Sequence, residues 1–310
     1  MKVGLIDIGS NTTKLLIAEQ GPGLQPIGFT PLVQSSLACR LFSNNPENKN
    51  ILRQDQAHAL IKCLLKFQNL CIKHRVDVIK AVATEAFRKS SNSSEIASLI
   101  EGKFSFKLKV LSGTEEASGV AKGLQTDPNV NKLGSYTALD IGGGSMEFIL
   151  VNNQKLENVL SLPLGAVQVA KSDPSCARQP IAPQNQEMVR SYIRNAIRED
   201  LFLFRTEHPR LVGTGGTLVF CRKILNLLHK PTKDGSIHKS GIEKLAQTVC
   251  ELSLQERIDQ FPDLPPDRAD IFPYGLLTVL EIMNFFEVQE IIHSYHNLRY
   301  GLVQEIMESA

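Results

Sequence analysis

The sequence predicts an α/β protein made of two domains that repeat one pattern. Short apolar runs alternate with amphipathic helical stretches along the chain, which is typical of helices packed on mixed sheets. The strand–turn–strand pattern that opens the chain restarts near its middle, and an internal repeat of this kind indicates a duplicated domain. A length of 310 residues is sufficient for two domains. We therefore expect two α/β domains facing each other across a cleft.

The first domain begins with a meander of strands. Apolar runs at residues 2–7 and 15–19 flank a polar turn, and a third run at residues 24–33 completes the meander. Apolar residues recur at helical spacing from Arg53 to His74, which predicts a long amphipathic helix. Further strands and helices are expected in alternation, at residues 76–84 (strand), 90–102 (helix with a serine N-cap and Glu95 in its first turn), 106–111 (strand) and from residue 112 (helix).

The stretch SYTALDIGGGSMEFILVNN, residues 135–153, repeats the opening hairpin. Aligned on its acid, it matches Asp7 with Asp140, Ile8 with Ile141, Gly9 with Gly142 and Thr12 with Ser145. We place the N-terminal domain at residues 1–125 and the C-terminal domain at 126–310, with a hinge in the polar stretch 124–134. The last helix, about 298–310, either packs back on the first domain or faces a partner subunit.

The second domain follows the same order of elements. LSLPLGAVQVA, residues 160–170, is expected to supply its third strand, and PRLVGTGGTLVF reads as a strand entering a glycine-rich turn. Helices are expected at residues 184–205 and 241–252, and an acidic turn precedes an apolar helix in DRADIFPYGLLTVLEIMNFF.

Composition excludes several classes of protein. The formal net charge of +2 creates no strong field toward nucleic acid or membrane, so an anionic ligand needs a local site. The chain has no run of about 18 apolar residues and no signal-peptide pattern at its start. Its six cysteines form no C-x-x-C pair, which favours free thiols over a metal site or a disulfide framework. We expect a cytoplasmic protein that binds neither nucleic acid polymers nor membranes.

Three small-residue turns are candidates for phosphate binding. Successive backbone N–H groups in such turns form a concavity that holds phosphate oxygens. The turns are Ser10–Thr13, Gly142–Ser145 and Gly213–Thr217. Chain closure alone explains any one of them. Three in one chain favour a polyanionic phosphate ligand.

Acids at the ends of the repeated strands are candidates for a magnesium site. Mg²⁺ in phosphate sites uses one or two carboxylates with water and phosphate oxygens. Asp7 and Asp140 end their strands at the two turns, and Glu147 lies two residues past Ser145. Turn capping is the structural alternative for either aspartate, but both copies keep the acid.

The helix expected from residue 112 carries two adjacent acids. Its apolar stripe is Ala117, Val120, Ala121 and Leu124, at helical spacing. Glu115 falls opposite the stripe and is expected in solvent, whereas Glu116 flanks it and can reach a cleft. A carboxylate beside a bound phosphate can orient or deprotonate a water molecule.

Thr84 and Arg88 follow another strand end in VATEAFRKSSN. A hydroxyl and a guanidinium both bind phosphate oxygens, and ligands in open α/β sheets bind beyond strand ends. A surface arginine on a helix is the alternative. The chain lacks a Walker A loop, a nucleophile elbow and H-E-x-x-H spacing, which argues against the commonest nucleotidase, esterase and zinc-hydrolase sites.

Taken together, these motifs resemble the exopolyphosphatase / guanosine pentaphosphate phosphohydrolase family. The resemblance rests on segments that run in order over nearly the whole chain: IDIGSNTTKLLI, ATEAFR, LSGTEEA, LDIGGGSMEF, SLPLGAVQ, VGTGGTL, DRADIFPYGLL and LRYGLV. It implies two actin-like (ribonuclease H-like) domains of the actin, sugar-kinase and heat-shock-chaperone superfamily, in the short two-domain form. Departures from the usual motifs lie at Met146, at Tyr300 and at Asn297 in HNLR.

The resemblance also assigns roles to residues. It implies that Glu116 orients or activates the attacking water, with Arg88 and Asp140 completing the catalytic set. Phosphate binding is expected at one group of residues, namely Asn11, Thr12, Thr84, Gly142, Gly143, Gly144, Ser145, Gly215 and Gly216. Mg²⁺ or another divalent cation is expected at Asp7, Asp140 and Glu147.

The expected activity is hydrolysis of a phosphoric anhydride by an exopolyphosphatase, which removes the terminal phosphate of inorganic polyphosphate processively or distributively. Hydrolysis of the 5′-phosphate of guanosine pentaphosphate is the alternative reaction. An ATP-dependent kinase or chaperone-like ATPase on the same fold is a different class, which the Glu116 motif and the lack of a further substrate or lid domain disfavour. A non-catalytic polyphosphate or alarmone sensor would keep the phosphate loops but would not need Glu116. Relatives often form homodimers, which the sequence leaves open here.

Overall fold

The computed structural model describes all of the chain except residues 22–27, 42–50, 174–178, 198–200, 207–208, 229–231 and 233. The chain divides into two compact units, Met1–Pro128 with His296–Ala310, and Asn129–Tyr295. The sequence placed a single boundary between residues 125 and 126, whereas the structure divides the chain after Pro128 and again after Tyr295. The second division arises because the last helix packs within the first unit. That the two domains face each other across a cleft stays a prediction.

The first unit is built on a five-stranded mixed sheet with the order β3-β2-β1-β4-β5. The central strand β1 is antiparallel to β2 and parallel to β4, which in turn is parallel to β5. The third strand extends further than predicted, to Ala38, and the start of its predicted range lies outside the described residues. The elements are β1 (Lys2–Ile8), β2 (Thr12–Gln20), β3 (Phe29–Ala38), α1 (Gln54–Lys73), β4 (Val78–Ala83), α2 (Glu85–Lys89), α3 (Ser93–Lys103), β5 (Leu108–Val110), α4 (Gly113–Gln125) and α12 (Leu298–Glu308).

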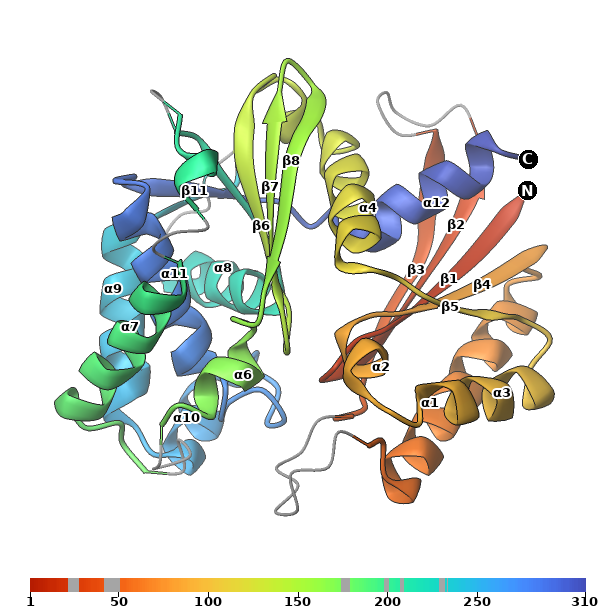
Figure 1. Ribbon diagram of the computed structural model, residues 1–310, viewed down its shortest axis with the longest axis horizontal. Coiled ribbons are helices and arrows are strands. Elements are labelled where there is room, and N and C mark those ends of the chain that lie inside the picture. Colours follow the sequence, from red (N-terminus) through yellow and green to blue (C-terminus); the bar gives the residue numbers. More distant parts are fainter. Residues whose placement is uncertain are drawn as a thin grey trace. The chain divides into compact units, whose positions relative to one another are not determined.

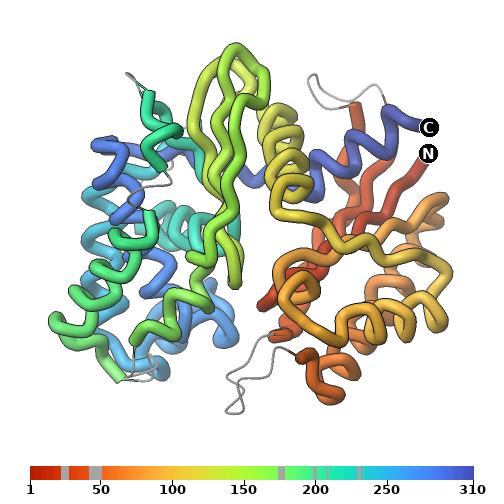
Figure 2. Tube along the Cα trace, in the orientation of Figure 1, coloured from red at the N-terminus to blue at the C-terminus, as the bar shows by residue number. Residues whose placement is uncertain are grey.

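Helices cover both faces of this sheet (Figure 1). On one face, alternate residues of β1 and β2 pack against the apolar stripe of α1, which includes Leu60, Leu64 and Phe67. On the other face, Val3 and Leu5 of β1 belong to a separate cluster with α12. In Figure 2 the blue C-terminal helix runs beside the red N-terminal strands.

Tyr300, one of the departures from the family motifs, belongs to that second cluster. It is buried, its ring centroid lies 5.8 Å from that of Phe29, and its ring stacks on His296 at 4.0 Å. Its hydroxyl accepts a hydrogen bond from Nε2 of Gln34 at 2.9 Å. Tyr300 is therefore a core residue that fastens α12 to the sheet.

The start of α3 differs from the prediction. Its N-cap is Asn92 rather than a serine, and no side-chain bond caps the helix. The Asn92 amide instead accepts from the Leu52 N–H and donates to the Leu52 carbonyl, both at 2.9 Å. A long-range contact of this kind leaves no local sequence signal.

The second unit repeats the strand order of the first. Its sheet has the order β10-β11-β9-β6-β7-β8, in which β6 is antiparallel to β7 and parallel to β9, as β1 is to β2 and β4. The α/β class with two mixed sheets, expected from the repeat, is confirmed. The elements are α5 (Pro128–Asn131, at the division), β6 (Tyr136–Ile141), β7 (Met146–Asn152), β8 (Lys155–Leu162), α6 (Ala166–Ala170), α7 (Pro183–Ile197), η1 (Phe202–Phe204), β9 (Leu211–Gly215), α8 (Gly216–Leu228), β10 (Ser236–His238), α9 (Lys239–Glu251), α10 (Leu254–Gln260), α11 (Phe272–Phe285) and β11 (Glu290–His293).

One expected strand of this unit is partly a helix. Residues 160–170 were expected to form the third strand, but β8 ends at Leu162 and residues 166–170 form α6. The N–H groups at the start of α6 bond to carbonyls of the glycine turn after β6, a contact between distant segments that favours the helix.

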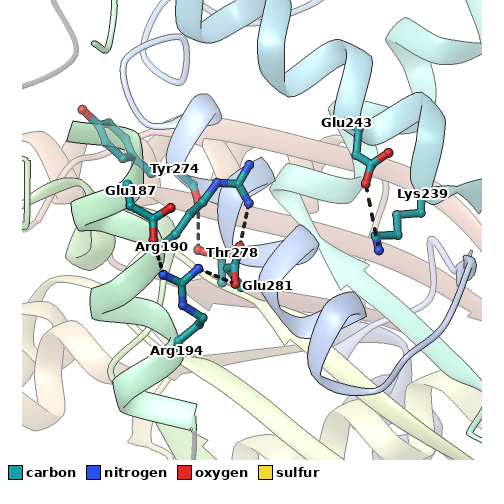
Figure 3. Close-up of polar contacts among 8 residues, drawn as sticks. All are labelled: Glu187, Arg190, Arg194, Lys239, Glu243, Tyr274, Thr278 and Glu281. Atoms are coloured by element: carbon teal, nitrogen blue, oxygen red, sulfur yellow. Dashed lines mark hydrogen bonds and ion pairs between the residues drawn. The ribbon is translucent and has the colours of Figure 1, made fainter. Parts of the chain in front are cut away.

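The core of the second unit surrounds α11, whose residues are buried over nearly its whole length. Arg190 and Arg194 of α7 converge on the buried Glu281 of α11, with N–O distances of 2.6 and 3.4 Å (Figure 3). Because Glu281 is only 3% exposed, these two guanidinium groups supply the charge compensation that a buried carboxylate needs. The pair of arginines thus fixes α7 against α11.

Five of the six cysteines fall within the described residues, and all five are buried free thiols, as expected: Cys39, Cys63, Cys71, Cys221 and Cys250. Cys176 lies outside the described residues. Among the helices that the structure describes, none has the length and apolarity needed to cross a membrane.

Candidate active site

In the first unit, three parallel strands end at one edge of the sheet. The register pairs Ile8 of β1 with Ala83 of β4, and Ala83 with Val110 of β5. The chain continues this alignment past the strands, since the Thr84 N–H donates to the Ile8 carbonyl at 3.3 Å and the Leu111 N–H to the Ala83 carbonyl at 2.9 Å. The polar residues that follow each strand are therefore brought together at the carboxyl edge, where α/β sheets bind ligands.

The loop after β1 is a tight, buried turn. The Gly9 N–H donates to the Thr12 carbonyl at 3.1 Å. Asp7, Asn11 and Thr12 are each less than 9% exposed, although all three are polar. The Asn11 side chain accepts a hydrogen bond from Nε of Arg40 at 3.0 Å. This loop is therefore more than a connection between strands, because it holds polar groups away from water.

Arg88 and Glu116 form an ion pair at the same edge. Arg88 Nη1 donates to Glu116 Oε2 at 2.7 Å and to the Leu111 carbonyl at 2.8 Å. The Glu116 side chain is 10% exposed and that of Arg88 is 22% exposed. Arg88 lies on α2, one helical turn after Thr84, and its backbone N–H bonds to the Thr84 carbonyl at 3.2 Å. The guanidinium thus supplies the charge compensation that a largely buried carboxylate needs.

Glu115 has a different environment, as the helical spacing predicts. It is exposed and completes a capping box at the start of α4, in which Ser112 Oγ accepts from the Glu115 N–H at 3.1 Å. Lys109 Nζ lies 2.7 Å from its carboxylate. The Lys109 hydrogen bond, with those of Ser112, lowers the pKa of Glu115 to about 2. Glu115 thus stabilises the helix, and Glu116 is the acid that lies at the strand edge.

The second unit repeats the turn geometry with glycines. Gly142 N–H donates to the Ser145 carbonyl at 3.0 Å, matching the Gly9–Thr12 bond. The carbonyls of Gly142 and Gly143 accept from the N–H groups of Ala166 and Val167 at 3.0 and 2.8 Å. All hydrogen bonds of Gly143 within the described chain use its carbonyl, so its N–H group is available to a ligand.

The first turn of α6 presses closely on this glycine turn. A Cβ atom on Gly165 would lie 2.4 Å from the carbonyl carbon of Gly143, which no real side chain tolerates. Gly165 is therefore required for the contact. Ser145, which follows the glycines, is buried.

The third predicted loop runs from the end of β9 into α8. Gly215 has a φ of +100°, and its backbone lies against Asp140, since a Cβ there would stand 2.8 Å from Asp140 Oδ1. At Gly216, the first residue of α8, a Cβ would stand 2.2 Å from Nη1 of Arg268. The Arg268 guanidinium thus lies beside the N-terminus of the 13-residue helix α8. Its charge and the helix dipole both favour an anion there.

The three predicted metal ligands fall in different units. Asp140 and Glu147 are direct register partners across β6 and β7, so their side chains share one face of the sheet. Ser161 Oγ donates to Glu147 Oε1 at 2.9 Å. Asp7 belongs to the first unit. Two carboxylates on one face are a donor set that suits Mg²⁺. Within the residues that the structure describes, no three His, Cys, Asp or Glu side chains gather into a metal cluster.

Structure and sequence agree on which residues lie at strand ends. Two arginines near the candidate residues were not predicted from the sequence. Arg40 contacts Asn11 from a segment outside every recognised motif, and no sequence signal points to it. Arg268 stands within DRADIFPYGLL and is brought to Gly216 only by the fold. In the first unit, hydrogen bonds connect Arg88 both to Thr84 and to Glu116. In the second unit, Gly215 lies beside Asp140 and Ile141, at the end of β6 and directly before the glycine turn.

The repeated strand order, with a tight polar turn after the first strand of each unit, defines an α/β protein built from two units that share one mixed-sheet topology. Within that class, the chain belongs to the Ppx/GppA phosphatase family, whose sequence model matches residues 16–310. The resemblance drawn from the motifs is thereby confirmed, and the protein is a hydrolase of the phosphatase type.

Several known proteins are similar over the full chain. Exopolyphosphatase 1 of Mycobacterium leprae is 23% identical and aligns with 100% of this chain and 90% of its own length. A bifunctional 3-dehydroquinate synthase/phosphatase of Fusobacterium nucleatum is 25% identical over 98% of this chain, which spans only 46% of that protein.

Solved structures show the same fold. A Cytophaga hutchinsonii exopolyphosphatase superposes with a TM-score of 0.88 at 20% identity, covering 100% of this chain and 99% of that one. The Aquifex aeolicus Ppx/GppA family member superposes with a TM-score of 0.79 at 23% identity, covering 100% and 98%. At these identities the likeness establishes the fold and leaves the substrate open.

Proposed function

We propose that the protein is an exopolyphosphatase that hydrolyses the terminal phosphoanhydride bond of inorganic polyphosphate. The observation that carries the proposal is the ion pair of Glu116 and Arg88 at the carboxyl edge of the first sheet. A protein that only binds phosphate chains would need the binding loops. It would not need a largely buried carboxylate such as Glu116, paired with an arginine, at the same sheet edge. The names of the similar exopolyphosphatases support the choice of substrate.

In the proposed reaction, Glu116 orients a water molecule and accepts its proton as the water oxygen attacks the terminal phosphorus in line. The bond from this phosphorus to the bridging oxygen breaks, so orthophosphate is released and the shortened polyphosphate leaves with the bridging oxygen. Arg88 holds the Glu116 carboxylate in place through the 2.7 Å contact. In the first unit, Asn11 and Thr84 bind non-bridging phosphate oxygens. The N–H groups of the turn that contains Gly143, in the second unit, are of the kind that binds such oxygens as well. Positioning and electrostatics supply most of the rate enhancement in phosphoryl transfer.

A divalent cation, Mg²⁺ by its chemistry, is part of the proposal. Asp140 and Glu147 would hold it, since they share one face of the second sheet. Asp7, which lies in the first unit, stays a predicted ligand. When bound, such a cation offsets the negative charge of the phosphate chain. We expect chelation with EDTA to abolish phosphate release and added Mg²⁺ to restore it.

The decisive experiment compares substrates. Phosphate release with Mg²⁺ is measured side by side from short polyphosphate, long polyphosphate and guanosine pentaphosphate. The proposal predicts that polyphosphate is the better substrate by kcat/KM. Preference for guanosine pentaphosphate would reassign the substrate within the family. Saturable binding of polyphosphate without release of phosphate would replace the enzyme with a sensor.

A further inference from the structure

The segment that follows β3 is fastened to the loop after β1 by three hydrogen bonds. The Cys39 N–H donates to the Asn11 carbonyl at 3.1 Å, and the Leu41 N–H donates to the Ser10 carbonyl at 2.9 Å. Between them, Arg40 Nε donates to Asn11 Oδ1 at 3.0 Å. Backbone and side chain of Asn11 are thus both held by one short stretch of chain. The two backbone bonds extend the pairing of β2 with β3, which ends at Thr12 and Ala38, so the side-chain bond from Arg40 is the contact that this pairing does not explain.

The contact with Arg40 fixes which way the Asn11 amide faces. A guanidinium carries only donors, so the atom of Asn11 that faces it must be the carbonyl oxygen. The amide nitrogen, Nδ2, therefore points the other way. Nδ2 is buried and has no hydrogen-bond partner among the described residues. Asn11 as a whole is only 4% exposed.

A buried N–H donor without an acceptor is unfavourable, and proteins rarely leave one unless a ligand completes it. The acceptor that fits is an oxygen lone pair, and an anionic oxygen forms the stronger hydrogen bond. The positive charge of Arg40 on the amide oxygen also polarises the amide and strengthens its N–H donation. In a member of the Ppx/GppA phosphatase family, a phosphoryl oxygen of the substrate is such an acceptor.

We propose that Arg40 is a positioning residue that acts through Asn11, turning the Asn11 amide so that Nδ2 donates to a phosphoryl oxygen of the substrate. The inference rests on the proposed phosphate-chain hydrolysis, since it names a further residue of that same site. Arg40 itself touches Asn11 and is given no contact with the substrate.

A double-mutant cycle tests this. Arg40→Gln is expected to lower kcat/KM for long-chain polyphosphate by about 10- to 100-fold, the usual effect of losing a charge-assisted hydrogen bond. Arg40→Lys keeps a charged donor and should recover part of the loss. In an Asn11→Ala background, Arg40→Gln should lower kcat/KM by less than about twofold, because the residue through which it acts is gone. Additive effects would overturn the inference and would assign Arg40 a direct electrostatic role.

Arg53→Gln is the matched control. Arg53 also lies in the first unit and pairs with Asp55 on the surface, so its replacement removes the same charge without touching Asn11. Its kcat/KM should stay near that of the wild type. An equal loss in this variant would show that net charge, and not the Asn11 contact, is responsible.

A spectroscopic readout separates this inference from the proposed function. With the protein labelled at asparagine side-chain nitrogens, the Asn11 amide signals are identified by their loss in Asn11→Ala. Tripolyphosphate should shift these signals in the wild type and not in Arg40→Gln. If no substrate is hydrolysed but this result holds, the enzyme proposal fails and the Arg40 inference stands. Equal shifts in both proteins would overturn the Arg40 inference whatever the activity.

Discussion

Arg88 Nη1 lies 2.7 Å from Oε2 of Glu116 and also donates to the Leu111 carbonyl at 2.8 Å. One guanidinium nitrogen thus joins an acid on α4 to the residue that follows β5. The contact brings together side chains 28 residues apart in the sequence. It also places a positive charge beside a carboxylate whose side chain is only 10% exposed.

Removal of this guanidinium is expected to disable the carboxylate without unfolding α4. In Arg88→Met, Glu116 loses the charged donor that holds its Oε2 at 2.7 Å. We expect kcat for polyphosphate to fall by about 100-fold or more. The measurement is the rate of phosphate release. Wild-type kcat in Arg88→Met would show that Arg88 does not position Glu116, and Arg53→Met serves as the control for the loss of a positive charge.

Close packing at Gly165 should be essential for the glycine turn of the second unit. In Gly165→Ala the new methyl group would stand 2.4 Å from the carbonyl carbon of Gly143, so the turn must move. We expect a loss of stability of about 1–3 kcal/mol, typical of overpacking. Activity should fall by about 100-fold, since a shift of about 1 Å is costly at a reacting centre.

Gly102→Ala is the matched control for that change. Gly102 lies near the end of α3, and a Cβ atom there meets nothing within 4 Å. Alanine is the better helix former, so stability should be unchanged or rise by up to about 1 kcal/mol. Urea unfolding and phosphate release, measured on both variants, distinguish a specific contact from a general intolerance of glycine replacement.

His293 of β11 should make stability depend on pH. It is only 2% exposed, and burial, with a smaller contribution from Arg222, lowers its pKa from 6.5 to about 3. Between these two values the unfolded chain binds a proton that the folded chain does not, so the free energy of unfolding falls as pH falls from about 6.5 toward about 3. The slope reaches up to about 1.4 kcal/mol per pH unit.

His293→Gln should flatten that slope, measured by urea unfolding at pH 7, 6 and 5. His58 lies exposed on α1. His58→Gln therefore removes an exposed histidine, and this variant should keep the slope of the wild type. If His293→Gln keeps it as well, the acid sensitivity originates elsewhere.

Much of the fold was predictable because the repeat is local and regular. The acids at Asp7 and Asp140 stand at equivalent positions of β1 and β6, and the hairpins that follow close with the same bond. The helical spacing of apolar residues in α4 predicts that Glu115 is exposed and that Glu116 is not, as the structure shows. These features depend on period and on turn chemistry, which a sequence displays directly.

What the sequence did not predict depends on contacts between distant segments. Residues 166–170 alternate in a way that suits a strand, yet they form α6 because the glycine turn accepts the N–H groups at its start. Arg40 and Arg268 reach Asn11 and Gly216 only through the fold. The place of Asn92 as the cap of α3 likewise follows from its bonds to Leu52.

The central claim is that Glu116 handles the attacking water in phosphate-chain hydrolysis. Glu116→Gln keeps the size of the side chain but removes its capacity to accept a proton. With Mg²⁺ and polyphosphate, we expect kcat to fall by about 100- to 10,000-fold, the usual contribution of a general base.

Glu115→Gln is the adjacent control, since Glu115 bonds to Lys109 and Ser112 at the surface and should be dispensable for turnover. The measurement is the rate of phosphate release from polyphosphate by the two variants and the wild type. Loss in Glu116→Gln with near-normal turnover in Glu115→Gln is the predicted result. Wild-type turnover in Glu116→Gln would contradict the account.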